Sequence, residues 1–412
     1  MQKRSLAQIM QLVSFAALVI CLPLGWRYIT KYPFAISWIN IFSLLFVMVS
    51  IAAEALLGVR TTLLRPIKIP KVYRLVLLGI VLATIVGTTQ TSPLTDAFGP
   101  WTSRFLQPLI VGYFAVRMFD RNPDYLKKLP QIILLSTIIP TLWVLLQFAG
   151  AVPFQDMHRA TAGYAFATTF ARWSMITVLF CAPWVLQQPK KRLAWLIVLT
   201  LAVLVLLATQ SYNAVVSAAI AGIIGLYLMP SRYKKIKIGF TVFIAIAALL
   251  AISFPSKLPK WNLTSTSSIQ TREQFWEVAR GVIKDNPLKG IGFKTWEHHY
   301  LDLRTKYATP PMRLDSSAQP HSFVLDSLVK TGILGLSFPL SIILVGISGV
   351  IIARKEDFDG FGWIGVALAM YCVSILLFGL LDDSWWSDDT IVFVYFWFLL
   401  AGWRQYKLAS KG

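Results

Sequence analysis

Residues 193–208 read LAWLIVLTLAVLVLLA, and residues 213–229, after a short polar turn, read NAVVSAAIAGIIGLYLM. Both segments lack charged residues, and each approaches the roughly 20 residues that a helix needs to cross a hydrocarbon layer of about 30 Å. The pair therefore predicts two membrane-spanning helices joined by a tight turn.

Apolar segments of this kind recur along the chain, bounded by Lys and Arg clusters, by Pro or by short polar turns. A chain of 412 residues with 56% hydrophobic and 14% charged residues has too little polar surface for a water-soluble globule. We predict an all-α, polytopic membrane protein with about twelve transmembrane helices. The predicted spans are 9–25, 36–57, 73–90, 104–119, 130–152, 166–187, 193–208, 213–229, 237–254, 335–353, 361–380 and 389–406.

The orientation follows from the basic residues, because cytoplasmic loops retain Lys and Arg. Of the 39 Lys and Arg residues, 23 fall in loops on the side that would hold both termini. The short loops on the other side hold only Arg27, Lys31, Arg104 and Arg159. We therefore expect both termini in the cytoplasm. The net charge of +20 reflects this topology, and no nucleic-acid partner is expected.

The longest segment between predicted spans covers 255–334 and lies on the outer side. It is too long for a passive connection, so we expect it to carry function. The chain is accordingly divided into helices 1–9 (1–254), an outer loop containing short helices (255–334), and helices 10–12 with a cytoplasmic tail (335–412).

Within this loop, Thr271 and Gln274 have the spacing of a helix-capping box, which predicts a helix from about 272 to 285, stopped by Pro287. Arg272 and Trp276 then share one helix face, where a guanidinium beside an aromatic side chain is suited to phosphate. The alternative is that the aromatic residues only dock the helix, with Arg272 as a solvated flank.

A second short helix is expected after Pro320, with His321 in its first turn and an end at Gly332 and Gly335. The helix N-terminus disfavours protonation of an imidazole, so His321 is suited to act as a general base near neutral pH. A structural, hydrogen-bonding histidine is the alternative.

Arg172 falls inside a predicted span, where a cation usually faces a cavity or a partner. Snorkelling to the outer headgroups is the alternative. The last outer turn contains four carboxylates that could bind a divalent cation, but acidic residues are also common on the outer side of such proteins. We expect them to be dispensable for chemistry: Asp382, Asp383, Asp388 and Asp389.

Four pieces of the outer loop occur in an order that resembles a known signature. These are Arg272-x-x-x-Trp276, Asn286-Pro287-Leu288-x-Gly290-Ile291-Gly292, Pro320-His321-Ser322-x-x-Leu325 and Gly332-Ile333-Leu334-Gly335. The order is similar to that of the O-antigen ligase and polymerase superfamily, and the likeness covers about 155–350. Arg159-x-x-x-Gly163 resembles a further family segment. The chain departs from the pattern at the turn around Tyr212, where an Arg is absent, and at Ser322 and Lys330.

The resemblance implies a membrane glycosyltransferase of GT-C-like architecture in a bacterial inner membrane, with a periplasmic active site. Its donor would be polysaccharide on undecaprenyl pyrophosphate, and its acceptor a hydroxyl of lipid A-core. It implies His321 as general base in an inverting displacement, without a metal or other cofactor. The residues expected to bind pyrophosphate or glycan are Arg272, Arg172, Arg159, Trp276 and Arg280.

Ligase is the first choice because no long soluble C-terminal domain is evident. A polysaccharide polymerase of the same superfamily is the closest alternative. A polysaccharide or lipid transporter would more typically show paired halves and broken helices. A metal-dependent glycosyltransferase acting through the acidic turn is the remaining possibility.

Overall fold

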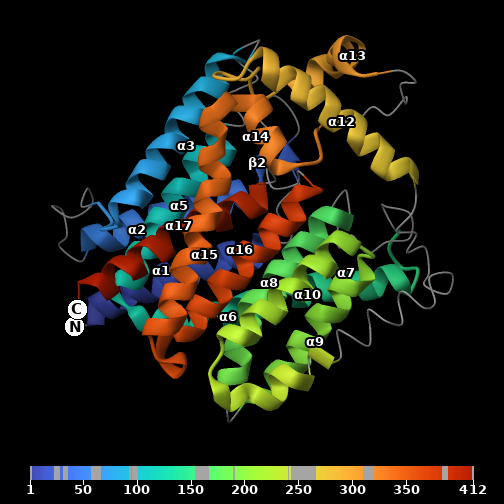
Figure 1. Ribbon diagram of the computed structural model, residues 1–412. Coiled ribbons are helices and arrows are strands. Elements are labelled where there is room, and N and C mark those ends of the chain that lie inside the picture. Colours follow the sequence, from blue (N-terminus) through green and yellow to red (C-terminus); the bar gives the residue numbers. More distant parts are fainter. Residues whose placement is uncertain are drawn as a thin grey trace.

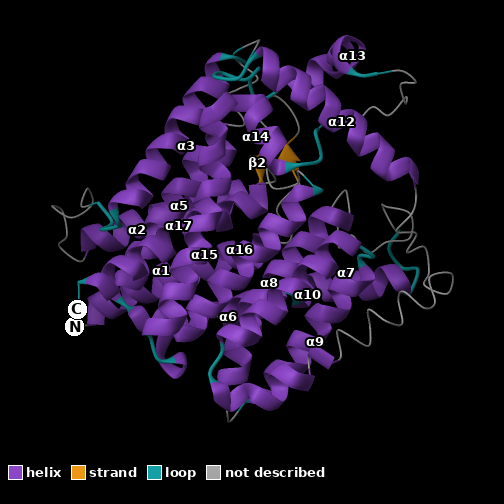
Figure 2. Cartoon of the chain, in the orientation of Figure 1, coloured by secondary structure: helices purple, strands orange, loops and turns teal. Residues whose placement is uncertain are grey.

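The computed structural model describes residues 2–22, 28–30, 36–56, 66–91, 94, 101–153, 167–188, 191–239, 241–242, 266–309, 319–382 and 388–410. Helices make up almost all of this part of the chain, and two short strands pair near its start (Figure 2). The strands β1 (Tyr28–Thr30) and β2 (Ile36–Ser37) are antiparallel.

The helices form a bundle whose two ends differ (Figure 1). Both termini lie together at one end, called here the terminal end, while α12 and α13 cross the opposite, outer end. The long helices are α1 (Gln2–Cys21), α2 (Trp38–Leu56), α3 (Lys71–Thr89), α5 (Gln107–Arg121), α6 (Pro123–Ser136), α7 (Ile138–Phe148), α8 (Ala167–Gln187), α9 (Arg192–Ala208), α10 (Tyr212–Leu228), α15 (Ser337–Lys355), α16 (Trp363–Leu380) and α17 (Asp388–Ala409).

Shorter elements join these helices and build the outer end. The single turns are η2 (Thr102–Leu106), η3 (Ser231–Tyr233), η5 (Gly332–Leu336) and η6 (Phe358–Gly362), and the outer helices are α12 (Thr266–Asp285), α13 (Thr295–Tyr307) and α14 (Phe323–Thr331).

Five helical segments of the described chain are long and apolar enough to cross a membrane. They are Ile39–Leu56, Lys71–Thr89, Pro123–Phe148, Phe323–Lys355 and Phe358–Leu380, and three shorter apolar helices accompany them at Leu6–Cys21, Arg192–Ala208 and Tyr212–Leu228. A multi-pass membrane protein is thereby supported, whereas the number twelve stays a prediction. Most of the expected span 237–254 lies outside the described residues.

Large apolar side chains cover the outside of the bundle. On α3, for example, Leu75 is 57% exposed and Leu78 is 53% exposed. Leu204 on α9 is similarly open at 55%. Patches of this size would aggregate in water, but they are the natural surface of a bundle whose solvent is lipid.

The centre of the bundle is α16, which is buried around its whole circumference and packs against α8, α10 and α15. A helix that is apolar on every side belongs in such a position. Its closest neighbour is α15, and a Cβ atom on Gly349 of α15 would lie 2.7 Å from the carbonyl oxygen of Gly365. Small residues at this crossing therefore allow the two backbones to touch.

The sequence predicted that the loops rich in Lys and Arg lie on one side of the membrane. In the structure, charged residues from several of these helix ends contact one another at the terminal end. Arg404 near the end of α17 contacts Glu356, just after α15, at 2.6 Å. Arg232, after α10, donates to the Asp359 carboxylate before α16, with Nη1 and Oδ2 2.8 Å apart. These contacts agree with the predicted alternation of the loops. Which end faces the cytoplasm stays a prediction.

Two boundaries differ from the prediction. The residues between the predicted spans 104–119 and 130–152 were expected to form a loop, yet α5 continues to Arg121 and α6 begins at Pro123. Proline fits the first turn of a helix, where its missing N–H is not needed. The expected span 130–152 therefore begins seven residues earlier and has Pro130 in its interior.

Candidate active site at the outer end

The outer loop has a small hydrophobic core of its own, separate from that of the bundle. Phe275 and Val278 of α12 pack there with Trp296 and Tyr300 of α13 and with Val329 of α14. The three helices thus form a folded layer over the outer end, and the layer fixes where their polar side chains lie. The domain boundaries at 254/255 and 334/335 remain predictions.

The helix α12 begins earlier than predicted. It starts at Thr266, so Thr271 lies inside it and is not its N-cap, whereas the end at Asp285 matches the expected stop before Pro287. Ser and Thr favour caps but are tolerated in a helix whose later turns pack well. The residues from Thr266 to Thr271 are mostly polar, so they show no helical spacing of apolar residues from which the earlier start could be predicted.

The turn after α12 is bonded to the end of α14. The Ile291 N–H donates to the Val329 carbonyl at 2.8 Å, and the Ile333 N–H donates to the Pro287 carbonyl at 2.8 Å. The Phe293 N–H donates to Thr91 Oγ1 at the end of α3, at 2.9 Å. The Pro-x-x-Gly-x-Gly segment is therefore a junction that ties the outer layer to the bundle.

Glycine is required at two positions of this junction. Gly290 has φ 64° and Gly332 has φ 63°, a region that residues with a Cβ rarely adopt. A Cβ on Gly290 would also lie 2.5 Å from the Val329 carbonyl oxygen, and one on Gly332 would overlap the backbone of Leu288. These signature glycines consequently have a structural role.

His321 lies just before α14, and not in its first turn as predicted. The N-cap position is Ser322, with φ −155° and ψ 119°, and His321 has φ 51°, which is uncommon for a residue other than glycine. Its ring packs on that of Phe275, with centroids 5.5 Å apart. Such backbone strain is found most often where surrounding structure holds a functional side chain in place.

Two charged side chains act on the His321 imidazole from different elements. Burial lowers the pKa of His321 below its ordinary value, the nearby Asp382 carboxylate opposes this shift, and the Arg272 guanidinium adds to it. Arg272 is half-buried on α12, while Asp382 follows α16 and is only 7% exposed. The site thus favours the neutral form of the imidazole, and both a cation and an anion act on it.

Asp382 was expected to be a dispensable surface carboxylate, and the structure places it differently. Phe323, at the start of α14, packs against Gly379 near the end of α16. This contact brings the end of α16 under His321, which is why Asp382 is buried there. The sequence held no signal for this pairing, because the two residues are far apart in the chain and neither lies in a periodic pattern.

The remaining residues expected on α12 differ in position. Trp276 is half-buried, and its indole Nε1 is buried without a hydrogen-bond partner among the described residues. Arg280 is exposed, and its charge acts on Glu277, whose carboxylate binds the backbone and hydroxyl of Thr309. Arg280 therefore belongs to the outer surface of the layer and is not brought to His321.

Arg172 is buried at 1% exposure inside α8. One of its electrostatic partners is the Tyr371 hydroxyl in the middle of α16, about 13 Å by helical rise from the end of that helix at Leu380. The snorkelling alternative is thus disfavoured, and a role for Arg172 at the pyrophosphate stays a prediction. Arg159, Asp383 and the side chains of Asp388 and Asp389 lie outside the described residues.

The turn between α9 and α10 also reaches this region. Gln210 has φ 50°, and the Asn213 side-chain amide donates to the Phe378 carbonyl at the end of α16, at 2.7 Å. The family pattern expects an Arg near Tyr212. The residue that departs from the family pattern is therefore next to Asn213, whose side chain contacts the end of α16, shortly before Asp382.

A buried ion pair on α14 also contacts α13. Lys330 Nζ lies 2.8 Å from Asp326 and 3.6 Å from Glu297 of α13, and neither Lys330 nor Asp326 is exposed. Lys330 departs from the family pattern, which has an acidic residue there. Here the acidic partner is present one helical turn earlier, at the spacing that allows contact.

Comparison with known families supports the resemblance stated from the sequence. Residues 195–340 match the family described as O-Antigen ligase. The matched segment contains α10, the outer layer and His321, and it supports a relationship to the O-antigen ligase superfamily. No curated protein matches the chain.

Proposed function

We propose that this protein is an inner-membrane glycosyltransferase that acts at the outer end of its bundle. It would transfer O-antigen polysaccharide from undecaprenyl pyrophosphate to a hydroxyl of lipid A-core. The family match over 195–340 supports the superfamily, and the grouping of His321, Arg272 and Asp382 supports a transfer reaction at this site.

The reaction would be a single displacement. The acceptor oxygen attacks the anomeric carbon of the donor sugar, the bond from that carbon to the pyrophosphate oxygen breaks, and undecaprenyl pyrophosphate leaves. His321 takes the proton of the acceptor hydroxyl. A general base must be unprotonated at the working pH, and burial together with Arg272 favours that form by lowering the pKa of His321.

Arg272 and Asp382 would have distinct parts. The Arg272 guanidinium would bind the pyrophosphate and stabilise the charge that develops on its leaving oxygen. Asp382 would orient the imidazole and stabilise the imidazolium that forms when His321 accepts the proton. This proposed role departs from the expectation, drawn from the sequence alone, that Asp382 is dispensable for chemistry.

The observation that carries the proposal is the position of His321 at the outer end: a half-buried imidazole with a positive φ, on which the charges of Arg272 and Asp382 both act. A structural histidine would not require either charge. The test is transfer by the purified protein, using lipid-linked polysaccharide as donor and lipid A-core as acceptor. Formation of the linked product supports the proposal, and its absence from folded, lipid-reconstituted protein contradicts it.

A polymerase of the same superfamily would use the same chemistry with a second lipid-linked glycan as acceptor. Deletion of the gene distinguishes the two. Loss of a ligase leaves polymerised glycan on undecaprenyl pyrophosphate, whereas loss of a polymerase leaves single repeat units on finished core. A metal-dependent reaction through Asp382 would instead be abolished by EDTA in the purified assay.

A further inference from the structure

A cavity of about 510 Å³ lies at the terminal end, away from the outer site. Three segments line it: the chain at 66–68 before α3, the last turns of α5, and the last turns of α17. None of the residues assigned to glycan transfer belongs to it. The residues that line this cavity therefore suggest a second function, separate from glycan transfer.

Cations dominate this lining. Those that line the cavity are Lys68, Arg117, Arg121 and Lys407, and the lining carboxylate is Asp120. Asp120 is already engaged, since it accepts a hydrogen bond from Trp403 Nε1 at 3.0 Å and pairs with Lys407 at 2.8 Å. The cavity consequently keeps an excess of positive charge.

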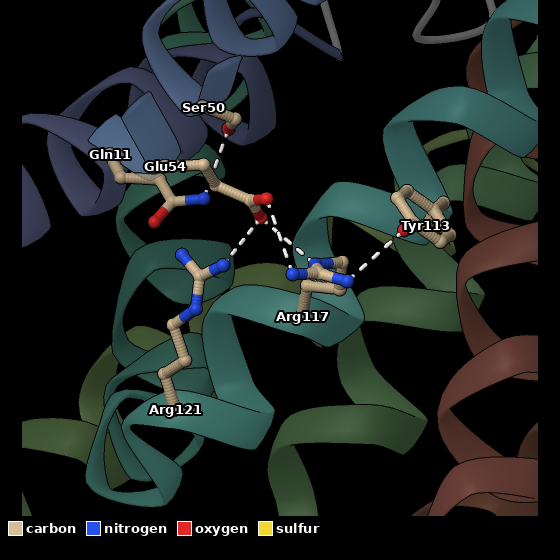
Figure 3. A network of polar contacts seen from close by, with 6 residues as sticks. All are labelled: Gln11, Ser50, Glu54, Tyr113, Arg117 and Arg121. Atoms are coloured by element: carbon tan, nitrogen blue, oxygen red, sulfur yellow. Dashed lines mark hydrogen bonds and ion pairs between the residues drawn. The ribbon is translucent and has the colours of Figure 1, made fainter. Parts of the chain in front are cut away.

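Glu54 of α2, fully buried beneath the cavity, fixes one guanidinium (Figure 3). Its two carboxylate oxygens accept from Arg117 Nε at 2.9 Å and from Arg117 Nη2 at 3.2 Å. Arg117 also donates to the Tyr113 hydroxyl at 3.2 Å. A bidentate pair of this kind holds the planar group in one orientation.

Arg121 is held less completely. Its Nη2 lies 2.7 Å from Glu54 Oε1, which is an ion-pair distance, yet neither terminal nitrogen forms a well-directed hydrogen bond among the described residues. Both terminal nitrogens of Arg121 are buried. Arg121 therefore contributes positive charge to the wall of the cavity while its guanidinium stays next to Glu54.

The surface beside the cavity is apolar. Four side chains on the α3 surface, beginning one turn beyond Lys68, are 42–57% exposed and follow helical spacing: Val72, Leu75, Leu78 and Leu82. Tyr406, whose ring lies 5.9 Å from Lys68 Nζ, and Trp403 are aromatic residues of the type that gathers at membrane interfaces. A basic pocket thus adjoins an apolar stripe that runs into the bilayer.

We propose that this cavity binds the phosphate of an anionic phospholipid from the leaflet at the terminal end, with acyl chains along the α3 stripe. Basic pockets between membrane helices commonly take such headgroups. A soluble phosphate would satisfy the cations but would make no use of the stripe. Bound lipid would join α5, α17 and the segment before α3, and would stabilise the folded protein by mass action.

The test measures thermal stability and lipid adducts of the full-length protein in a neutral detergent. The additives are phosphatidylglycerol, phosphatidylcholine and inorganic phosphate. We expect phosphatidylglycerol alone to raise the melting temperature and to remain bound in native mass spectra. Equal stabilisation by inorganic phosphate, or by phosphatidylcholine, would overturn the lipid assignment.

Paired variants give the control. Each basic residue near an anionic lipid contributes about a fivefold change in affinity, so Lys68→Gln with Arg121→Gln should weaken phosphatidylglycerol binding about 25-fold. Lys127→Gln with Lys128→Gln removes the same charge at the terminal end but outside the cavity. Because salt screens charges that lie away from the bound headgroup, this pair should change binding less than twofold. Equal losses in both pairs would contradict a defined site. If the first pair does not fold, Lys68→Gln alone keeps the Glu54 contacts and should weaken binding about fivefold.

Discussion

The charges of Arg272 and Asp382 both act on His321, and they shift its pKa in opposite directions. The rate of a reaction that needs neutral imidazole rises with pH through this pKa and then levels off. Because Asp382 raises the pKa, Asp382→Asn should move the acid limb of kcat/KM to lower pH. Because Arg272 lowers it, Arg272→Gln should move that limb to higher pH.

The measurement is kcat/KM for glycan transfer across about pH 5 to 8, the range in which histidine titrates. Unchanged acid limbs in both variants would separate the titration of His321 from catalysis. A purely structural Asp382 would lower the amount of folded protein without moving the limb.

Arg272 and Arg280 are two turns apart on α12 but differ in surroundings, which makes them a matched pair. Arg272→Ala should lower kcat by about 10²–10³, the usual effect of losing a donor to developing negative charge. Arg272→Lys should recover only part of the rate, because a point charge does not reproduce the two-pronged guanidinium. Arg280→Ala, on the exposed side beside Glu277, should stay within about twofold of wild type. Transfer rates at equal protein levels decide this, and equal losses in both Ala variants would remove Arg272 from the site.

Among the individual helices, the sequence predicted those that are marked by an apolar run or that end at a proline or glycine. Apolar runs located α9 and α10, Pro287 marked the end of α12, and Gly332 marked the end of α14. It did not predict the start of α12, because polar turns carry no apolar period. It also did not predict that Arg280 is exposed or that Asp382 is buried, because these depend on how the helices pack, for Asp382 on the contact between α16 and α14.

The glycine junction should be sensitive to a single methyl group. Gly332→Ala places a Cβ at positive φ and against the Leu288 backbone, so it should destabilise the outer layer by more than about 1 kcal/mol. Gly360→Ala is the control, since a Cβ there meets nothing within 4 Å. Limited proteolysis of α12 and α13 in detergent should speed up in the first variant only. Equal protection in both would contradict the junction.

For the whole molecule, the predicted topology places the start of α13 and the start of α6 on opposite sides of the membrane. Asp302 on α13 and Asp124 on α6 have similarly exposed side chains, at 86% and 84%. In a variant lacking Cys21, Cys181 and Cys372, an impermeant maleimide should label Asp302→Cys in intact cells with a permeable outer membrane. It should label Asp124→Cys only after the inner membrane is opened. The reverse pattern would invert the predicted orientation.

The arrangement of the helix ends was the feature that the sequence predicted best. The alternation of basic loops predicted which helix ends lie together, and the contact between Arg404 and Glu356 agrees with it. Glu54 shows what hydropathy overlooks, since a single carboxylate in an apolar run leaves the span recognisable. Its partners Arg117 and Arg121 come from a distant helix, and only the packed bundle reveals the pair.

The proposed role of His321 as the general base of glycan transfer can be tested with the purified His321→Gln variant. The measurement is its specific activity with lipid-linked polysaccharide and lipid A-core as substrates, with the folded fraction determined in parallel. Glutamine keeps a hydrogen-bonding side chain but cannot accept the proton. The account predicts a normal folded fraction and a rate lower by about 10²–10⁴. Wild-type activity per folded molecule would contradict it.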